Sequence, residues 1–154
     1  MRQPAVRQER DTVSGAGSVE DSGTVLTRDS HAPGLARHYV AGVLIGLRVP
    51  PCVVEAARII TSELVTNSVK YGCAQWVWVR VRMRAGGGGV TLTVSDSTPY
   101  RPLPTAGTAG DDDENGRGLF LVDALAARWG HGCAGADPSY GTAVWAELTW
   151  EAGA

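Results

Sequence analysis

The period of hydrophobic and polar residues changes along the chain, and three stretches alternate. Residues Trp76–Arg84 read W-V-W-V-R-V-R-M-R, which is the period of a half-buried strand. Val90–Ser95 alternates in the same way, and the four glycines Gly86–Gly89 between these stretches are typical of a hairpin turn. Thr142–Trp150 also alternates, and Thr24–Thr27 has the composition of a short first strand. The sequence therefore predicts a hairpin and two further strands.

Three other stretches have the spacing of helices. Gly34–Leu47 and the longer Val53–Tyr71 place apolar residues on one helical face. We expect Gly72 to end the second of these helices as a left-handed cap. A third helix is expected over Gly118–Ala127, after the long loop Pro99–Asn115. This order predicts an α+β fold, a two-layer α/β sandwich with helices on one face of a mixed, mostly antiparallel sheet.

Length and composition limit the class of protein. The 154 residues correspond to one ordinary domain, which we place at residues 23–151 after a lead-in over residues 1–22 that we expect to be disordered. The net charge of −2 and the pI near 5.9 argue against general nucleic-acid binding. The longest apolar run, Tyr39–Leu47, is too short to cross a membrane, and three cysteines without a C-x-x-C pair are typical of a reducing compartment. We therefore expect a cytoplasmic domain that contacts neither nucleic acid nor membrane directly.

The second predicted helix carries the first candidate site. Glu63, Asn67 and Lys70 are spaced i, i+4, i+7 and lie at the boundary between its apolar and polar faces, with Tyr71 beside them. A carboxylate, an amide and an ammonium in line can hold a hydrated divalent cation, touch phosphate oxygens and position a nucleophile. The alternative is an ordinary solvated flank of a helix.

Two further segments carry weaker signals. Asn115–Leu119 reads N-G-R-G-L before a predicted helix, where glycines and helix N–H groups suit an anion, or simply allow a turn. Asp96 follows the strand Val90–Ser95, where it can accept a hydrogen bond from an exocyclic amino group or can initiate a turn. His131 and Cys133 are two metal-ligand types without nearby partners, which favours an incidental pair.

These signals occur in the order of a known family. Glu63–Gly72, E-L-V-T-N-S-V-K-Y-G, resembles the N box of the GHKL ATPases, the superfamily of gyrase and the histidine kinases. Asp96 resembles the aspartate of the G1 box, Gly116–Leu119 resembles the G2 box, and Tyr140–Thr142 resembles the nucleotide contact of the final strand. The resemblance covers Thr24 to Trp150. Within the superfamily the chain resembles the bacterial anti-sigma-factor serine kinases and their small relatives.

The resemblance implies a Bergerat fold that binds ATP and Mg²⁺ between helices and sheet, under a lid at about residues 97–117. It implies that Glu63 polarises the attacking hydroxyl or water and that Asn67 coordinates Mg²⁺. It further implies that Asp96 accepts a hydrogen bond from the adenine amino group. The other residues implied to contact ATP are Lys70, Tyr71, Gly116, Arg117, Gly118, Leu119 and Thr142.

The implied function is that of a regulatory protein serine kinase, which transfers the γ-phosphoryl group of ATP to a serine of an anti-anti-sigma-like partner. A sigma-like factor is a second implied partner, and a homodimer is compatible with the resemblance. The alternative is a non-catalytic interaction module whose nucleotide is structural or absent. Two departures favour that alternative: the G1 box reads Asp96-Ser-Thr-Pro-Tyr instead of Asp-x-Gly-x-Gly, and the expected lid contains the acidic run Asp111–Glu114.

A third observation falls outside these motifs. Alternation places five residues of the first hairpin strand on its outward face, together with Trp145 of the last strand; the five are Trp76, Trp78, Arg80, Arg82 and Arg84. Trp and Arg are enriched at the centres of protein interfaces. The alternative is that the Trp rings and Arg stems only cover each other on an exposed sheet.

Overall fold

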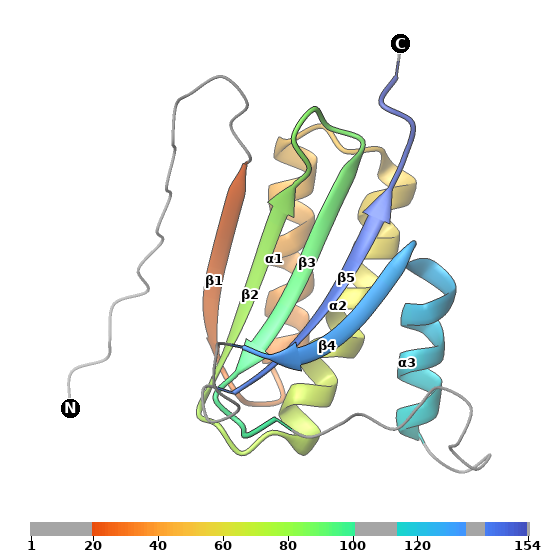
Figure 1. The fold of residues 1–154 in the computed structure, drawn as a ribbon. Coiled ribbons are helices and arrows are strands. Elements are labelled where there is room, and N and C mark those ends of the chain that lie inside the picture. Colours follow the sequence, from red (N-terminus) through yellow and green to blue (C-terminus); the bar gives the residue numbers. More distant parts are fainter. Residues whose placement is uncertain (1–19, 101–113, 135–140, 154) are drawn as a thin grey trace, which may run out of the picture.

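The computed structural model describes residues 20–100, 114–134 and 141–153. Its sheet has the strand order β1-β2-β3-β5-β4, and every described pairing is antiparallel. The strands are β1 (Asp21–Thr27), β2 (Trp76–Met83), β3 (Gly89–Asp96), β4 (Arg128–Cys133) and β5 (Thr142–Thr149), and the helices are α1 (Ala32–Gly46), α2 (Pro51–Tyr71) and α3 (Glu114–Leu125). Figure 1 shows α1 and α2 behind the sheet, and α3 packs against α2. The predicted α+β two-layer sandwich is confirmed, although the sheet is antiparallel rather than mixed.

The core lies between the helices and one face of the sheet. Alternate residues of β2 point into it: Val77, Val79 and Val81 are buried, whereas Trp78, Arg80 and Arg82 between them are exposed. The predicted two-residue period is therefore confirmed. The largest fully buried side chains are those of Leu44, Ile60, Leu92, Val40, Val65, Val77, Val79, Val81, Val90, Val122 and Thr61.

The structure contains one strand that the sequence did not predict. β4 reads R-W-G-H-G-C, and its two glycines and short length hide any alternation. It forms because β5 offers a full edge for pairing, with Trp129 opposite Ala146 and His131 opposite Val144. The last two strands are thus an antiparallel pair that forms one edge of the sheet.

Several predicted boundaries are wrong by a few residues. β1 begins at Asp21, three residues before the predicted Thr24, because it pairs along most of β2. The predicted helix over Gly118–Ala127 is α3, which spans Glu114–Leu125. Glycine is unfavourable inside helices, yet α3 begins before Gly116 and includes both Gly116 and Gly118.

Gly72 ends α2, but the predicted left-handed cap is wrong. Its φ of −71° and ψ of 157° are those of extended backbone. The chain leaves the helix directly into an extended segment, and its N–H donates to the carbonyl oxygen of Ser68 at 2.9 Å. The need for glycine at this position is steric and belongs to the site described below.

Some expectations concern residues outside the described ranges. They include residues 1–19 of the lead-in, the acidic run Asp111–Asp113 within the expected lid, and Tyr140 of the final motif. The lead-in was predicted to be disordered over residues 1–22, and this is wrong for Asp21 and Ser22, which belong to β1. In the described part of the chain, no helix has both the length and the hydrophobicity that crossing a bilayer requires.

Candidate nucleotide site

A buried carboxylate lies at the end of β3, on the face that the helices cover. Asp96 is only 7% exposed, and two donors hold it. The backbone N–H of Thr98 donates to Oδ1 at 2.7 Å, and the hydroxyl of Ser68 on α2 donates to Oδ2. The interpretation of Asp96 as a turn residue is therefore correct, but these two hydrogen bonds do not use all of the acceptor positions of the carboxylate. A carboxylate has about four acceptor positions, so Asp96 can accept a further N–H.

Two threonines connect this end of β3 to its neighbours. Thr142 lies opposite Asp96 in the β3–β5 register, and its hydroxyl donates to the carbonyl oxygen of Thr98 at 3.0 Å. Thr98 in turn accepts the backbone N–H of Cys73 through Oγ1 at 3.0 Å. The end of α2, the end of β3 and the start of β5 are therefore joined through hydrogen bonds at one point.

Two glycines allow these segments to approach. A Cβ at Gly72 would lie 3.2 Å from Thr98 Oγ1 and 3.3 Å from Asp96 Oδ2, and would also collide with the carbonyl oxygen of Ser68. Gly141 has a φ of +117°, and a Cβ there would collide with the backbone of Asp96. A side chain at either position would push α2 or β5 away from the carboxylate.

The polar flank of α2 leads away from this point. Glu63 and Asn67 are half-buried, while Lys70 and Tyr71 at the end of the helix are exposed. Leu64 and Val65 beside them are buried in the core. The expected position at the boundary between core and solvent is confirmed for Glu63 and Asn67.

The carboxylate of Glu63 faces the start of α3. A Cβ at Gly118 would lie 2.6 Å from Glu63 Oε2, much closer than real Cβ atoms approach other atoms. Because α3 begins at Glu114, Gly116 and Arg117 lie in its first turn, where backbone N–H groups have no partner within the helix. The structure thus brings Glu63 of the N box and Gly118 of the G2 box together, although they are far apart in sequence.

Leu119 and Thr142 complete the set of expected contacts. The side chain of Leu119 is buried, so only its backbone can face a ligand. Asp96 and Thr142 lie near the Ser68 end of the polar flank, and Gly118 lies near the Glu63 end. Five residues of helix separate these two ends, which is about 7.5 Å. The candidate site is therefore a strip along α2, with a buried acceptor at one end and helix N–H groups at the other.

Several residues of the site were missed by the sequence analysis. Ser68 and Thr98 orient Asp96 through hydrogen bonds. Both lie within segments that resemble family motifs, but neither was among the residues expected to contact ATP. Arg28 follows β1 and donates to the carbonyl oxygen of Val69 at 2.9 Å and also to that of Ala74, so it anchors the end of α2. Only tertiary structure brings Arg28 to this helix, and no local signal identifies it.

Tyr100 and His131 form another pair that no motif indicated. The Tyr100 hydroxyl lies 3.1 Å from His131 Nδ1, and the two rings stack at a centroid distance of 5.8 Å. This pair ties the segment after β3 to β4. Tyr100 occupies the position of the second glycine in the G1 box of the GHKL pattern. In this chain the contact between Tyr100 and His131 holds the segment instead.

A comparison with protein families found a match. The family model for the histidine kinase-like ATPase domain matches residues 26–135, which is most of the chain. No curated protein matches the chain. The matched range contains Glu63, Asn67, Asp96 and Gly118.

Proposed function

Because this chain belongs to the histidine kinase-like ATPase family, we propose that it is a protein serine kinase that uses ATP and Mg²⁺. Membership makes it an ATP-binding regulatory protein of the GHKL type. The serine acceptor goes beyond the family match. We place that serine on an anti-anti-sigma-like protein, with a sigma-like factor as a second partner. The observation that carries the proposal is the approach of Glu63 to Gly118, which puts a carboxylate beside the expected phosphate site.

The residues present fit ATP and a divalent cation. Asp96 is a buried acceptor that suits an exocyclic amino group. The amide oxygen of Asn67 is a ligand type that Mg²⁺ accepts, and it lies one turn from Glu63 on the same flank. Gly118 lets the Glu63 carboxylate lie against the start of α3, where a Cβ would collide with it. Lys70 would approach the phosphates from the end of the flank, and Tyr71 would border the base.

The proposed reaction moves one proton and one phosphoryl group. Mg-ATP supplies the electrophilic γ-phosphorus and the neutralisation of phosphate charge, which account for most catalysis in such transfers. Glu63 accepts the proton of the serine hydroxyl while the serine oxygen bonds to the γ-phosphorus. At the same time the bond between the γ-phosphorus and the bridging oxygen breaks, and that oxygen leaves with ADP. The N–H groups at the start of α3 favour negative charge on the transferred group. The products are ADP and phosphoserine.

One observation favours the alternative of a non-catalytic module. Thr98 and Tyr100 occupy the positions of the two G1 glycines, and both are engaged: Thr98 with Cys73 and Tyr100 with His131. This segment therefore has side chains where the GHKL pattern has space for a nucleotide. Such a protein would bind ATP weakly or hold it without turnover.

ADP release from Mg-ATP by the wild-type chain and by Glu63→Ala distinguishes the two functions. A kinase should show slow turnover with water as the acceptor, and the variant should lose it while still binding ATP. Binding without any Glu63-dependent turnover would overturn the kinase proposal and favour the interaction module.

A further inference from the structure

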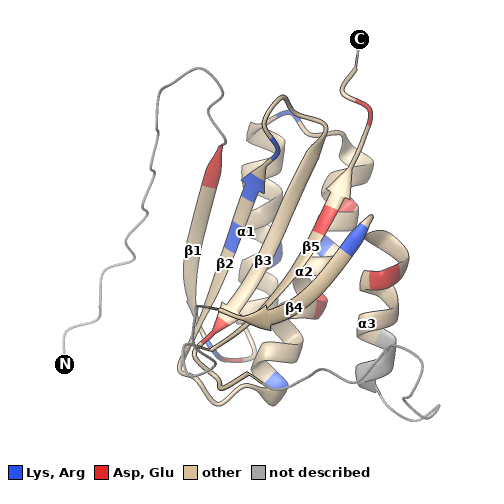
Figure 2. Ribbon diagram, in the orientation of Figure 1, with Lys and Arg blue, Asp and Glu red and all other residues tan. Residues whose placement is uncertain are grey.

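The face of the sheet opposite the helices carries a group of arginine and tryptophan side chains. Its members come from β2, β4 and β5 and from the position directly after β2; they are Trp78, Arg80, Arg82, Arg84, Arg128 and Trp145, here called the Arg/Trp face. The register places Arg80 in line with Thr93 and Trp145, and Arg82 in line with Thr91, Glu147 and Arg128. The predicted grouping of Trp145 with the β2 arginines is therefore confirmed. In Figure 2 the arginines of β2 and β4 lie on either side of the glutamate of β5.

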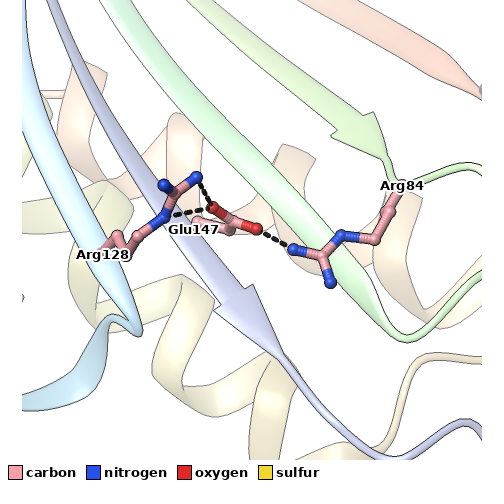
Figure 3. A network of polar contacts seen from close by, with 3 residues as sticks. All are labelled: Arg84, Arg128 and Glu147. Carbon is pink, nitrogen blue, oxygen red and sulfur yellow. Dashed lines mark hydrogen bonds and ion pairs between the residues drawn. The ribbon is translucent and has the colours of Figure 1, made fainter.

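Glu147 organises the positive charge on this face. Its side chain is only 10% exposed, whereas those of Arg84 and Arg128 are 53% and 72% exposed. Arg128 donates to Oε2 at 3.0 Å from Nε and 2.6 Å from an Nη, and Arg84 reaches Oε1 from the far side (Figure 3). These arginines hold the pKa of Glu147 below its usual value, with the hydrogen bond from Arg128 as the largest cause. One buried carboxylate thus fixes two exposed guanidinium groups.

Two glycines make room for this arrangement. Arg84 passes over β3, where a Cβ at Gly89 would lie 3.1 Å from its Nε. The ring of Trp145 lies over Gly130 of β4, where a Cβ would be 2.8 Å from the ring. Arg128 then stacks on this ring at 5.9 Å from its centroid. The side chains are therefore held flat against the sheet, which reduces the entropy that a partner would have to remove on binding.

The face is positive although the chain as a whole has a net charge of −2. On this face, the strands together with Arg84, which follows β2, carry four guanidinium groups and two carboxylates. The carboxylates are those of Glu147 and Asp21. Apolar surface adjoins them: Trp78 is 42% exposed and its cross-strand neighbour Val25 is 40% exposed. Arginine and tryptophan beside exposed apolar side chains are typical of interface centres.

We propose that the Arg/Trp face docks an acidic segment of a partner protein, with its carboxylates on Arg82, Arg84 and Arg128 and its apolar residues on Trp78 and Val25. A nucleic acid fits less well, because Glu147 and Asp21 would repel its phosphates and Arg128 covers one face of Trp145. The face lies on the opposite side of the sheet from α2 and the candidate nucleotide site (Figure 1). Docking therefore leaves the nucleotide site open.

Fluorescence anisotropy at low salt with a labelled synthetic peptide of repeating Glu-Glu-Leu tests this docking. The wild-type chain should bind the peptide, and Arg82→Glu should weaken binding by about tenfold or more, because a charge-assisted contact becomes a repulsion. Arg82 is chosen because Arg84 and Arg128 hold the buried Glu147. The matched control is Arg58→Glu, which makes the same change of charge on the exposed face of α2 and should bind like the wild type.

Two comparisons keep the result specific. A Gln-Gln-Leu peptide should bind at least about tenfold more weakly than the acidic peptide, since the guanidinium groups then meet no charge. Mg-ATP should leave the affinity unchanged, and the measurement needs no turnover, so its outcome is independent of the kinase proposal. Equal loss of binding in Arg82→Glu and Arg58→Glu, or tighter binding of a labelled single-stranded oligonucleotide than of the peptide, would overturn the proposal. Circular dichroism establishes that both variants are folded.

Discussion

Replacing Gly118 by alanine should slow ATP turnover without destabilising the fold. The added Cβ would lie 2.6 Å from Glu63 Oε2, whereas ordinary contact begins at 3.4 Å. The carboxylate oxygen must therefore move by roughly 0.8 Å, and a misplacement of about 1 Å at a catalytic group can cost about 100-fold in rate. We expect turnover to fall by about ten- to 100-fold, with ATP affinity nearly unchanged because the displaced group acts on the nucleophile.

The effect on stability should be small for two reasons. Alanine is preferred over glycine inside a helix by about 0.5–1 kcal/mol, which favours the variant. The colliding atom is the end of a flexible side chain, so the backbone of α2 need not shift. The two effects oppose each other, and thermal unfolding should move by no more than a few degrees.

Gly42→Ala is the matched control. Gly42 lies in α1, and a Cβ there would meet nothing within 4 Å. This variant gains the same helix preference, so its melting temperature should rise slightly while turnover stays at the wild-type rate. Wild-type turnover in Gly118→Ala would refute the reasoning, because the position of Glu63 would then not matter for the reaction.

Four further substitutions probe the remaining roles. Asn67→Ala should abolish Mg²⁺-dependent ATP binding in calorimetry, because a metal ligand acts in the ground state. Glu63→Ala should retain binding and lose turnover, because the carboxylate acts mainly in the transition state. Equal loss of ATP affinity in both variants would show that these roles are misassigned. Asp96→Ala should erase most of a preference for ATP over GTP of about five- to 150-fold, and an unchanged ratio of dissociation constants in a folded variant would reject the adenine contact. Glu147 contributes stability that is fully present above its ordinary pKa of 4.5 and is lost as the pH falls through its lowered folded-state pKa. Glu147→Gln should therefore show less loss of melting temperature than the wild type between about pH 5 and 3, and parallel curves would contradict the role of Arg128 in holding the carboxylate.

Local patterns predicted most elements of this fold but not their tertiary contacts. The alternation of β2 and the helical spacing of α2 are strong signals, since each repeats over many residues. β4 has only six residues with two glycines, and it exists because β5 provides an edge for pairing. The start of α3 was placed too late because glycine preference is a weak local effect that packing against α2 outweighs.

In the candidate site too, local motifs predicted some residues, whereas others depend on tertiary contacts. Glu63, Asn67 and Asp96 belong to motifs, so their spacing and order identified them. Ser68 and Arg28 act through contacts with residues distant in sequence, and neither has a local signature. The glycine at position 72 was expected for a left-handed turn, whereas the structure requires it for close approach to Asp96.

Titration calorimetry with ATP, in the presence and absence of Mg²⁺, tests whether this site binds a nucleotide through a metal ion. The proposed arrangement has the base at Asp96, at the end of β3, and a metal at Asn67, on the polar flank of α2. It predicts heat of binding with Mg-ATP, a much lower affinity when Mg²⁺ is removed, and a rise in melting temperature with Mg-ATP, as for any ligand of the native state. Neither heat nor a thermal shift at millimolar Mg-ATP would contradict it.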